Sequence, residues 1–163
     1  MKNEFEPGKF IVFMIADYLL ALPIAAVLKV VNCPPVNNGV PRAAGLVQMG
    51  HHMLVILDLH QKLATSYSSE LTRNSPFLVV TQVLQGQLCG IPVDEPPNLV
   101  ELPRDSLRAL PESCDRVGPL DMVSHVAVLS QEDKTFTIFI LDINRVLSAT
   151  TNSTNPRLIA AAT

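Results

Sequence analysis

Residues 45–59 read GLVQMGHHMLVILDL and contain two apolar runs, Leu46 to Met49 and Met53 to Leu59. A short polar break that contains glycine separates the runs, and this pattern is typical of a β-hairpin. Asp58 stands near the end of the second run, before a polar segment with the character of a helical turn. We expect its carboxylate to accept free backbone N–H groups there, as an N-cap side chain does.

The end of this stretch recurs later in the chain. Residues 56–63 read ILDLHQKL, and residues 140–147 read ILDINRVL at an offset of 84. The context upstream is also similar, because each half opens with an apolar run and continues through an apolar segment that contains proline. Such self-similarity predicts a duplication. We therefore expect two structurally similar lobes in tandem, in which Asp142 caps a helix as Asp58 does.

The composition favours a β-rich fold with an aliphatic core. Hydrophobic residues make up 48% of the 163 residues, but aromatic residues make up only 5% and tryptophan is absent. The core must therefore be built from Val, Ile and Leu, which favour strands. The thirteen prolines also oppose a helical bundle, since proline breaks helix interiors.

The net charge of −3 and the sequence pI of about 5.7 argue against nucleic-acid binding, which needs a basic surface.

Residues 10–31 are apolar enough to suggest a membrane span, but Asp17 and Pro23 interrupt them. A central Asp is costly in hydrocarbon. A hairpin of Phe10 to Ile15 and Tyr18 to Ile24 fits better, so we predict no direct membrane insertion. A helix over residues 24–31 remains an alternative, because Ala25 and Ala26 have a high helix propensity.

The histidines offer one candidate metal site. His51, His52 and His60 lie near the predicted hairpin. A fold-back would be needed to gather them around zinc, with His125 as an optional further ligand. Adjacent side chains in a strand point to opposite faces, which favours solvated turn histidines instead. The chain also lacks a nucleophile motif and a phosphate-binding glycine loop. We predict no catalytic residue, metal or cofactor. The alternative is a small metal-binding β-barrel enzyme that uses these three histidines.

The chain has three cysteines, Cys33, Cys89 and Cys114, and no C-x-x-C spacing. An odd number of scattered cysteines is typical of reduced thiols in a cytoplasmic protein.

The order of these motifs resembles the CheW-like adaptor family of bacterial chemotaxis over about residues 8–148. Tyr18 to Ile24 resembles the family's "Y-x-(L/I)-P-(I/V)" strand, with two extra residues before the proline. Residues 45–59 resemble its "G-(V/I)-(I/V)-N-L-R-G-x-x-(I/L)-P-(V/I)-(I/L)-D-L" stretch. Gly90 to Asp94 resembles "G-(L/I)-x-V-D", and Ile138 to Asp142 resembles "I-x-(L/I)-L-D".

The resemblance implies a mainly β fold of two SH3-like five-stranded β-barrel lobes packed together, with a few short helices. The domain would span residues 8–148, with lobe 1 at about 8–64, lobe 2 at about 76–148 and a partly disordered tail at 149–163. The resemblance further implies a non-catalytic cytoplasmic adaptor. Such an adaptor bridges a CheA-type histidine kinase and a methyl-accepting chemoreceptor or a diverged equivalent.

The sequence departs from the family at its receptor-contacting turn, "N-L-R-G". The matching positions, and hence the candidate partner-binding residues, are Gln48, Met49, Gly50 and His51. Gly50 stands in place of the arginine and supplies neither its forked donors nor its fixed charge. An alternative is therefore a CheW-like scaffold in a pilus-motility or phototaxis system without ordinary receptor coupling. We expect Gly50→Arg to leave folding intact.

Overall fold

The computed structural model describes residues 8–32, 46–63, 76–82, 86–111 and 118–152. Of the features predicted above, Cys33, Cys114 and tail residues 153–163 lie outside the described residues. The tail predicted from residue 149 begins inside a helix that ends at Asn152.

The described residues form eleven strands: β1 (Gly8–Ile15), β2 (Tyr18–Pro23), β3 (Val27–Asn32), β4 (Leu46–Met49), β5 (His52–Ile56), β6 (Phe77–Gln82), β7 (Leu88–Val93), β8 (Asn98–Leu102), β9 (Leu107–Ala109), β10 (Val123–Gln131) and β11 (Lys134–Leu141). They also form two α-helices, α1 (Leu59–Leu63) and α3 (Ile143–Asn152). Three 3₁₀ helices complete the described part: η1 (Ile24–Ala26), η4 (Arg104–Ser106) and η5 (Gly118–Met122).

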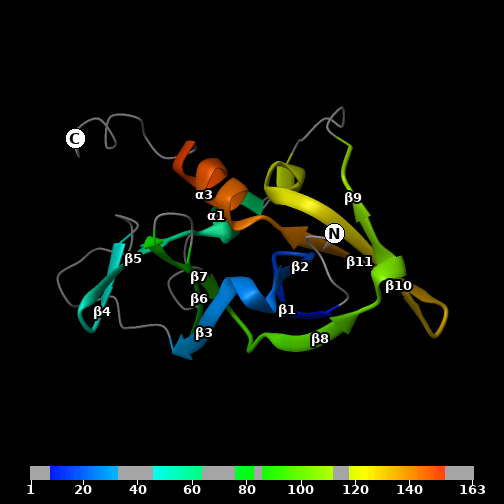
Figure 1. The fold of residues 1–163 in the computed structure, drawn as a ribbon, viewed down its shortest axis with the longest axis horizontal. Helices are drawn as coiled ribbons and strands as arrows, with labels where there is room; N and C mark the ends of the chain where they lie inside the picture. Colours follow the sequence, from blue (N-terminus) through cyan, green and yellow to red (C-terminus); the bar gives the residue numbers. More distant parts are fainter. Residues whose placement is uncertain (1–7, 33–45, 64–75, 83–85, 112–117, 153–163) are drawn as a thin grey trace, which may run out of the picture.

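The strands form two sheets. The first has the order β8-β1-β2-β11-β10-β9, and the second has the order β3-β6-β7-β5-β4. Figure 1 shows the two sheets side by side, with α1 and α3 close together above their junction. The predicted mainly β fold with two packed lobes and a few short helices is confirmed. The second sheet has the five strands implied by the resemblance, whereas the first has six.

The first sheet must bend into a barrel, because its two edge strands are joined by a very short connection. Only four residues, 103–106, separate β8 from β9, and most of them form η4. Neighbouring strands lie about 4.8 Å apart, so a flat sheet of six strands would hold its edges about 24 Å apart. The chain from Leu102 to Leu107 spans at most about 18 Å even when fully extended. The two edges of the sheet therefore approach each other.

Each sheet combines strands from both halves of the sequence. The first sheet takes β1 and β2 from the N-terminal half and β8 to β11 from the C-terminal half. Strands of the two halves pair at four places. β1 pairs with β8 and β3 pairs with β6 in antiparallel fashion, whereas β5 pairs with β7 and β11, its counterpart in the repeat, pairs with β2 in parallel fashion. The pairing pattern thus repeats as a duplication requires. It does not follow the expected tandem division into residues 8–64 and 76–148, because η1 carries the chain from β2 in the first sheet into β3 in the second.

Buried apolar residues form three clusters. One fills the first sheet and includes Phe10, Ala21 and Ile140, and a smaller one fills the second sheet with Leu54, Leu78 and Val80. The third, here called the inter-lobe core, lies between the sheets and is formed by the following buried residues: Phe13, Ile15, Leu20, Leu22, Leu57, Leu59, Leu63, Val79, Cys89, Ile91, Val93, Met122, Val123, Leu141, Val146 and Ala149.

The inter-lobe core explains the apolar run at residues 10–31. In β2, Leu20 and Leu22 face the inter-lobe core while Ala21 faces the interior of the first sheet. A strand that is buried on both faces has a nearly continuous apolar sequence. The run forms β1, β2, η1 and β3, so the helical alternative for residues 24–31 is limited to one 3₁₀ turn. Within the described ranges, no helix has the length and apolar character needed to cross a membrane.

We predict that Gly90→Ala destabilises the protein by about 1–3 kcal/mol, which is typical of overpacking. A Cβ added at Gly90 would lie 2.9 Å from Cγ and Cδ1 of Leu78, whose side chain is fully buried. Urea unfolding of the variant measures the loss.

The Leu78→Ala/Gly90→Ala double variant provides the matched control, because removing the Leu78 side chain leaves room for the new methyl group. Gly90→Ala should therefore lower the free energy of unfolding less in the Leu78→Ala background than in the wild type. If the losses of the two single variants simply add up in the double variant, the proposed clash is contradicted.

Candidate functional site

The hairpin predicted at residues 46–59 is confirmed as β4 and β5, although β5 ends at Ile56 rather than at Leu59. Met49 pairs with His52, so Gly50 and His51 form a two-residue turn. Gly50 has a φ of 61°, whereas His51 is not among the residues with positive φ. A positive φ at only the first of the two positions is the pattern of a type II′ turn, which prefers glycine there.

This turn, defined here as Met49 to His52, is an exposed surface of the second sheet. Gly50, His51 and His52 are exposed and Met49 is half-buried, whereas the side chain of Gln48 lies outside the described part of the structure. The turn offers backbone groups and imidazoles to a partner in place of a guanidinium. A partner-binding role for Gln48, Met49, Gly50 and His51 remains a prediction.

A second exposed surface, which the sequence analysis missed, lies near the junction of the two sheets. We call it the rim patch, and it consists of four aliphatic side chains that are 39–54% exposed: Ile24, Leu28, Val30 and Leu99. Leu99 pairs with Ile11 of β1, and β1 contacts η1, where Ile24 lies. Figure 1 shows β1, β3 and β8 along the same lower side of the molecule.

The surroundings of the rim patch explain its position. Ile11 and Val27, which neighbour it, are half-buried and pack against the inter-lobe core. Leu28 and Val30 lie on β3, which is an edge strand of the second sheet. Exposed aliphatic residues on adjoining segments are typical of surfaces that bind another protein. The exposure of these residues could not be predicted from the sequence, because Leu and Val occur in strands whether they are buried or exposed.

The structure separates the histidines of the candidate metal site. His51 and His52 lie at the exposed turn, whereas His60 lies beyond the opposite end of β5, which spans about 13 Å from His52 to Ile56. His125 belongs to the first sheet, where its Nδ1 lies 2.9 Å from Oγ of Ser124. Within the described ranges, no group of three or more His, Cys, Asp or Glu residues is arranged to hold a metal ion. The geometry therefore does not support the metal-enzyme alternative.

His60 instead contacts two carboxylates. Its Nε2 lies 3.1 Å from Oδ2 of Asp94, and its Nδ1 lies 3.6 Å from Oδ1 of Asp58. Burial of the ring lowers the pKa of His60, but the two adjacent carboxylates raise it, and the resulting pKa lies above the ordinary value of 6.5. Asp94 is 34 residues away in sequence, which is why the contact was not predicted.

Asp58 and Asp142 occupy equivalent positions before α1 and α3. Oδ1 of Asp58 accepts the backbone N–H of His60 at 3.1 Å. Oδ1 of Asp142 accepts the N–H of Asn144 at 2.9 Å and that of Arg145 at 3.4 Å. Both contacts have the geometry of an N-cap, in which a side-chain oxygen satisfies the free N–H groups of the first helical turn.

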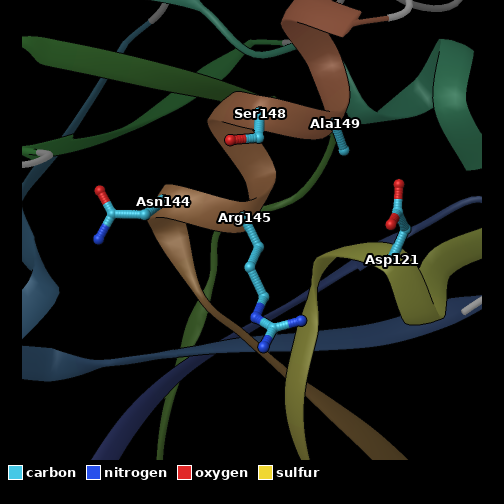
Figure 2. Close-up of a pocket in the computed structure, with 5 residues that line it drawn as sticks. All are labelled: Asp121, Asn144, Arg145, Ser148 and Ala149. Atoms are coloured by element: carbon cyan, nitrogen blue, oxygen red, sulfur yellow. The ribbon is translucent and has the colours of Figure 1, made fainter. Parts of the chain in front are cut away.

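Neither the Cys89 thiol nor the hollow between η5 and α3 is arranged in a way that suits catalysis. Burial raises the pKa of the Cys89 thiol to about 11, so the thiol stays protonated near neutral pH and is a poor nucleophile. A hollow of about 320 Å³ lies between η5 and α3, and Figure 2 shows the residues that line it: Asp121, Asn144, Arg145, Ser148 and Ala149. Arg145 interacts with its own helix cap, since its Nε lies 3.8 Å from Oδ2 of Asp142.

We predict that Asp142→Ala destabilises the protein by about 1 kcal/mol, because two N–H groups of α3 lose their acceptor. Thermal or urea unfolding measures the change. Asp142→Asn keeps a capping oxygen and serves as the control. Its stability should therefore fall less than that of the alanine variant. Equal losses for the two variants would contradict the capping role.

We also predict that Gly50→Arg keeps the fold but lowers the free energy of unfolding by about 1 kcal/mol, because an L-residue at positive φ is strained. A Cβ at Gly50 meets no atom within 4 Å, so the cost comes from the backbone and not from a clash. His51→Arg places an arginine one position later without that strain and is the control. A Gly50→Arg variant as stable as His51→Arg would contradict the turn geometry.

The chain is similar to a known protein family and to solved structures. A family model described as "CheW-like domain" matches residues 9–151. No curated protein matches the chain. Among solved structures, the chain is similar to the crystal structure of the scaffolding protein TtCheW from Thermoanaerobacter tengcongensis, with a TM-score of 0.62 and 21% sequence identity. The similarity covers 84% of this chain and 90% of that chain, and it indicates a common fold.

Proposed function

The chain belongs to the CheW-like domain family, and on that premise we propose that it is a non-catalytic adaptor in chemotaxis-type signal transduction. It bridges a CheA-type histidine kinase and a methyl-accepting chemoreceptor or a diverged equivalent in the cytoplasm. The observation that carries this proposal is the family match, which extends from β1 into the end of α3. The similar structure from Thermoanaerobacter tengcongensis is likewise described as a scaffolding protein.

The two exposed surfaces support an adaptor with two partners. The rim patch is aliphatic and lies near the junction of the sheets, whereas the Met49 to His52 turn is polar and lies at the end of the β4–β5 hairpin. Because their chemistry differs, the two surfaces suit different proteins. The rim patch can bind an apolar helix face or the matching edge of a sheet, with about 800 Å² buried on each partner.

A second candidate function is that of a CheW-like scaffold in a pilus-motility or phototaxis system. The observation that favours it is Gly50, which replaces the arginine of the family's receptor-contacting turn. A receptor that lacks a matching acidic group would suit this turn better than an ordinary chemoreceptor would.

Binding of the purified chain to two purified proteins from the same genome tests both candidates. One is the CheA-type kinase, and the other is the signalling fragment of a chemoreceptor. Binding to both supports the bridging adaptor. Binding to the kinase without the receptor favours the second candidate, and binding to neither contradicts both.

We predict that the double variant Leu28→Lys/Leu99→Lys weakens binding to one of the two partners by at least about tenfold, because two charges would be buried in an apolar contact. Binding to the other partner should stay unchanged. Titration calorimetry against each partner measures both affinities.

Val128→Lys is the matched control, since Val128 is 44% exposed on β10 and lies outside the rim patch. It should leave both affinities unchanged. Wild-type affinity of the rim-patch variant for both partners would contradict a binding role for this surface.

A further inference from the structure

The buried residue His60 makes a contact that joins two segments distant in sequence. The residue is 6% exposed and belongs to α1, while Asp94 directly follows β7. The ring lies between the two carboxylates, with Nε2 facing Asp94 and Nδ1 facing Asp58. Nδ1 is buried and has no hydrogen-bond partner among the described residues.

The contact suits a doubly protonated ring better than a neutral one. A neutral imidazole has one N–H donor and one acceptor nitrogen, whereas the imidazolium ion has two donors. When Nε2 donates to Asp94, the lone pair of a neutral Nδ1 faces the Asp58 oxygen at 3.6 Å, and both groups are acceptors. Protonation of Nδ1 replaces this repulsion with an attraction between opposite charges.

The ring of His60 contacts two charged groups, Asp58 and Asp94. Among the elements packed against α1, η5 carries the charged residue Asp121 and β1 carries Lys9. Neither affects the titration of His60, whose pKa reflects burial together with Asp58 and Asp94.

We propose that His60 is a proton-controlled clamp that fastens α1 to the end of β7. The clamp acts on the inter-lobe core, because Leu59 and Leu63 of α1 and Val93 of β7 all belong to it. The protonated ring donates to Asp94 across the two segments and attracts Asp58, which directly precedes α1. The neutral ring keeps one hydrogen bond, so α1 is held more weakly.

The direction of the pH dependence follows from the raised pKa of the folded state. A group that binds its proton more tightly when folded stabilises the fold fully at pH values below its unfolded pKa, near 6.5. This contribution is lost as the pH rises through the folded pKa, which lies above 6.5. The attachment of α1 should therefore weaken from mildly acidic to mildly alkaline conditions.

Hydrogen exchange and urea unfolding of the full chain, at about pH 6 and about pH 8, test the clamp. After correction for intrinsic exchange rates, protection of α1 should fall severalfold between the two pH values in the wild type. His60→Gln and Asp94→Asn should each reduce this difference. The controls His51→Gln, at the exposed turn, and Asp105→Asn, in η4, should keep it.

A titration of the wild-type histidine rings by NMR makes the test independent of how well the variants fold. The His60 ring should titrate with a midpoint above 6.5, and Asp94→Asn should lower that midpoint. A wild-type midpoint at or below 6.5 would overturn the proposal. The same holds if His60→Gln retains the full pH difference in α1 protection, or if His51→Gln abolishes it.

Discussion

The packing of the two sheets against each other is the interaction on which the rest of the structure depends. The second sheet has only a small core of its own, with Leu54, Leu78 and Val80 fully buried, whereas the inter-lobe core is far larger. A fully buried aliphatic side chain contributes about 1.5–3 kcal/mol. The contact with the first sheet therefore adds substantially to the apolar stabilisation of the second sheet, because Val79, Ile91 and Val93 are buried in it. The same contact fixes the rim patch and the β4–β5 turn relative to each other.

Local features of the fold were predictable from the sequence, and distant ones were not. The hairpins and the capping positions of Asp58 and Asp142 follow from apolar runs, turn residues and the repeated ILD motif, which act over a few residues. The exchange of strands between the lobes has no local signal, because Ile138 finds its partner Leu19 about 120 residues away. The contact between His60 and Asp94 was missed for the same reason. The rim patch was missed because Leu28 and the buried Leu78 stand in similar apolar runs.

The β4–β5 turn shows how a binding surface can change while the backbone beneath it is kept. Glycine at the first turn position supplies the positive φ that a tight hairpin needs, so the hairpin forms without the family's arginine. What changes is the chemistry that a partner meets, from a fixed positive charge to backbone groups and imidazoles. In a protein whose proposed role is to hold two others together, such a change alters the choice of partner and leaves the scaffold intact.

The interleaved strands also have a consequence during synthesis. The β1–β2 hairpin leaves the ribosome well before β11, so β2 cannot pair with β11 until about 120 further residues have been made. At about 5–20 residues per second, this takes roughly 6–24 s. Throughout that time, a hairpin that is apolar on both faces lacks its final neighbours, and transiently exposed apolar strands are prone to aggregate. A nascent chain of this design therefore exposes apolar strands for longer than one whose lobes are completed in sequence.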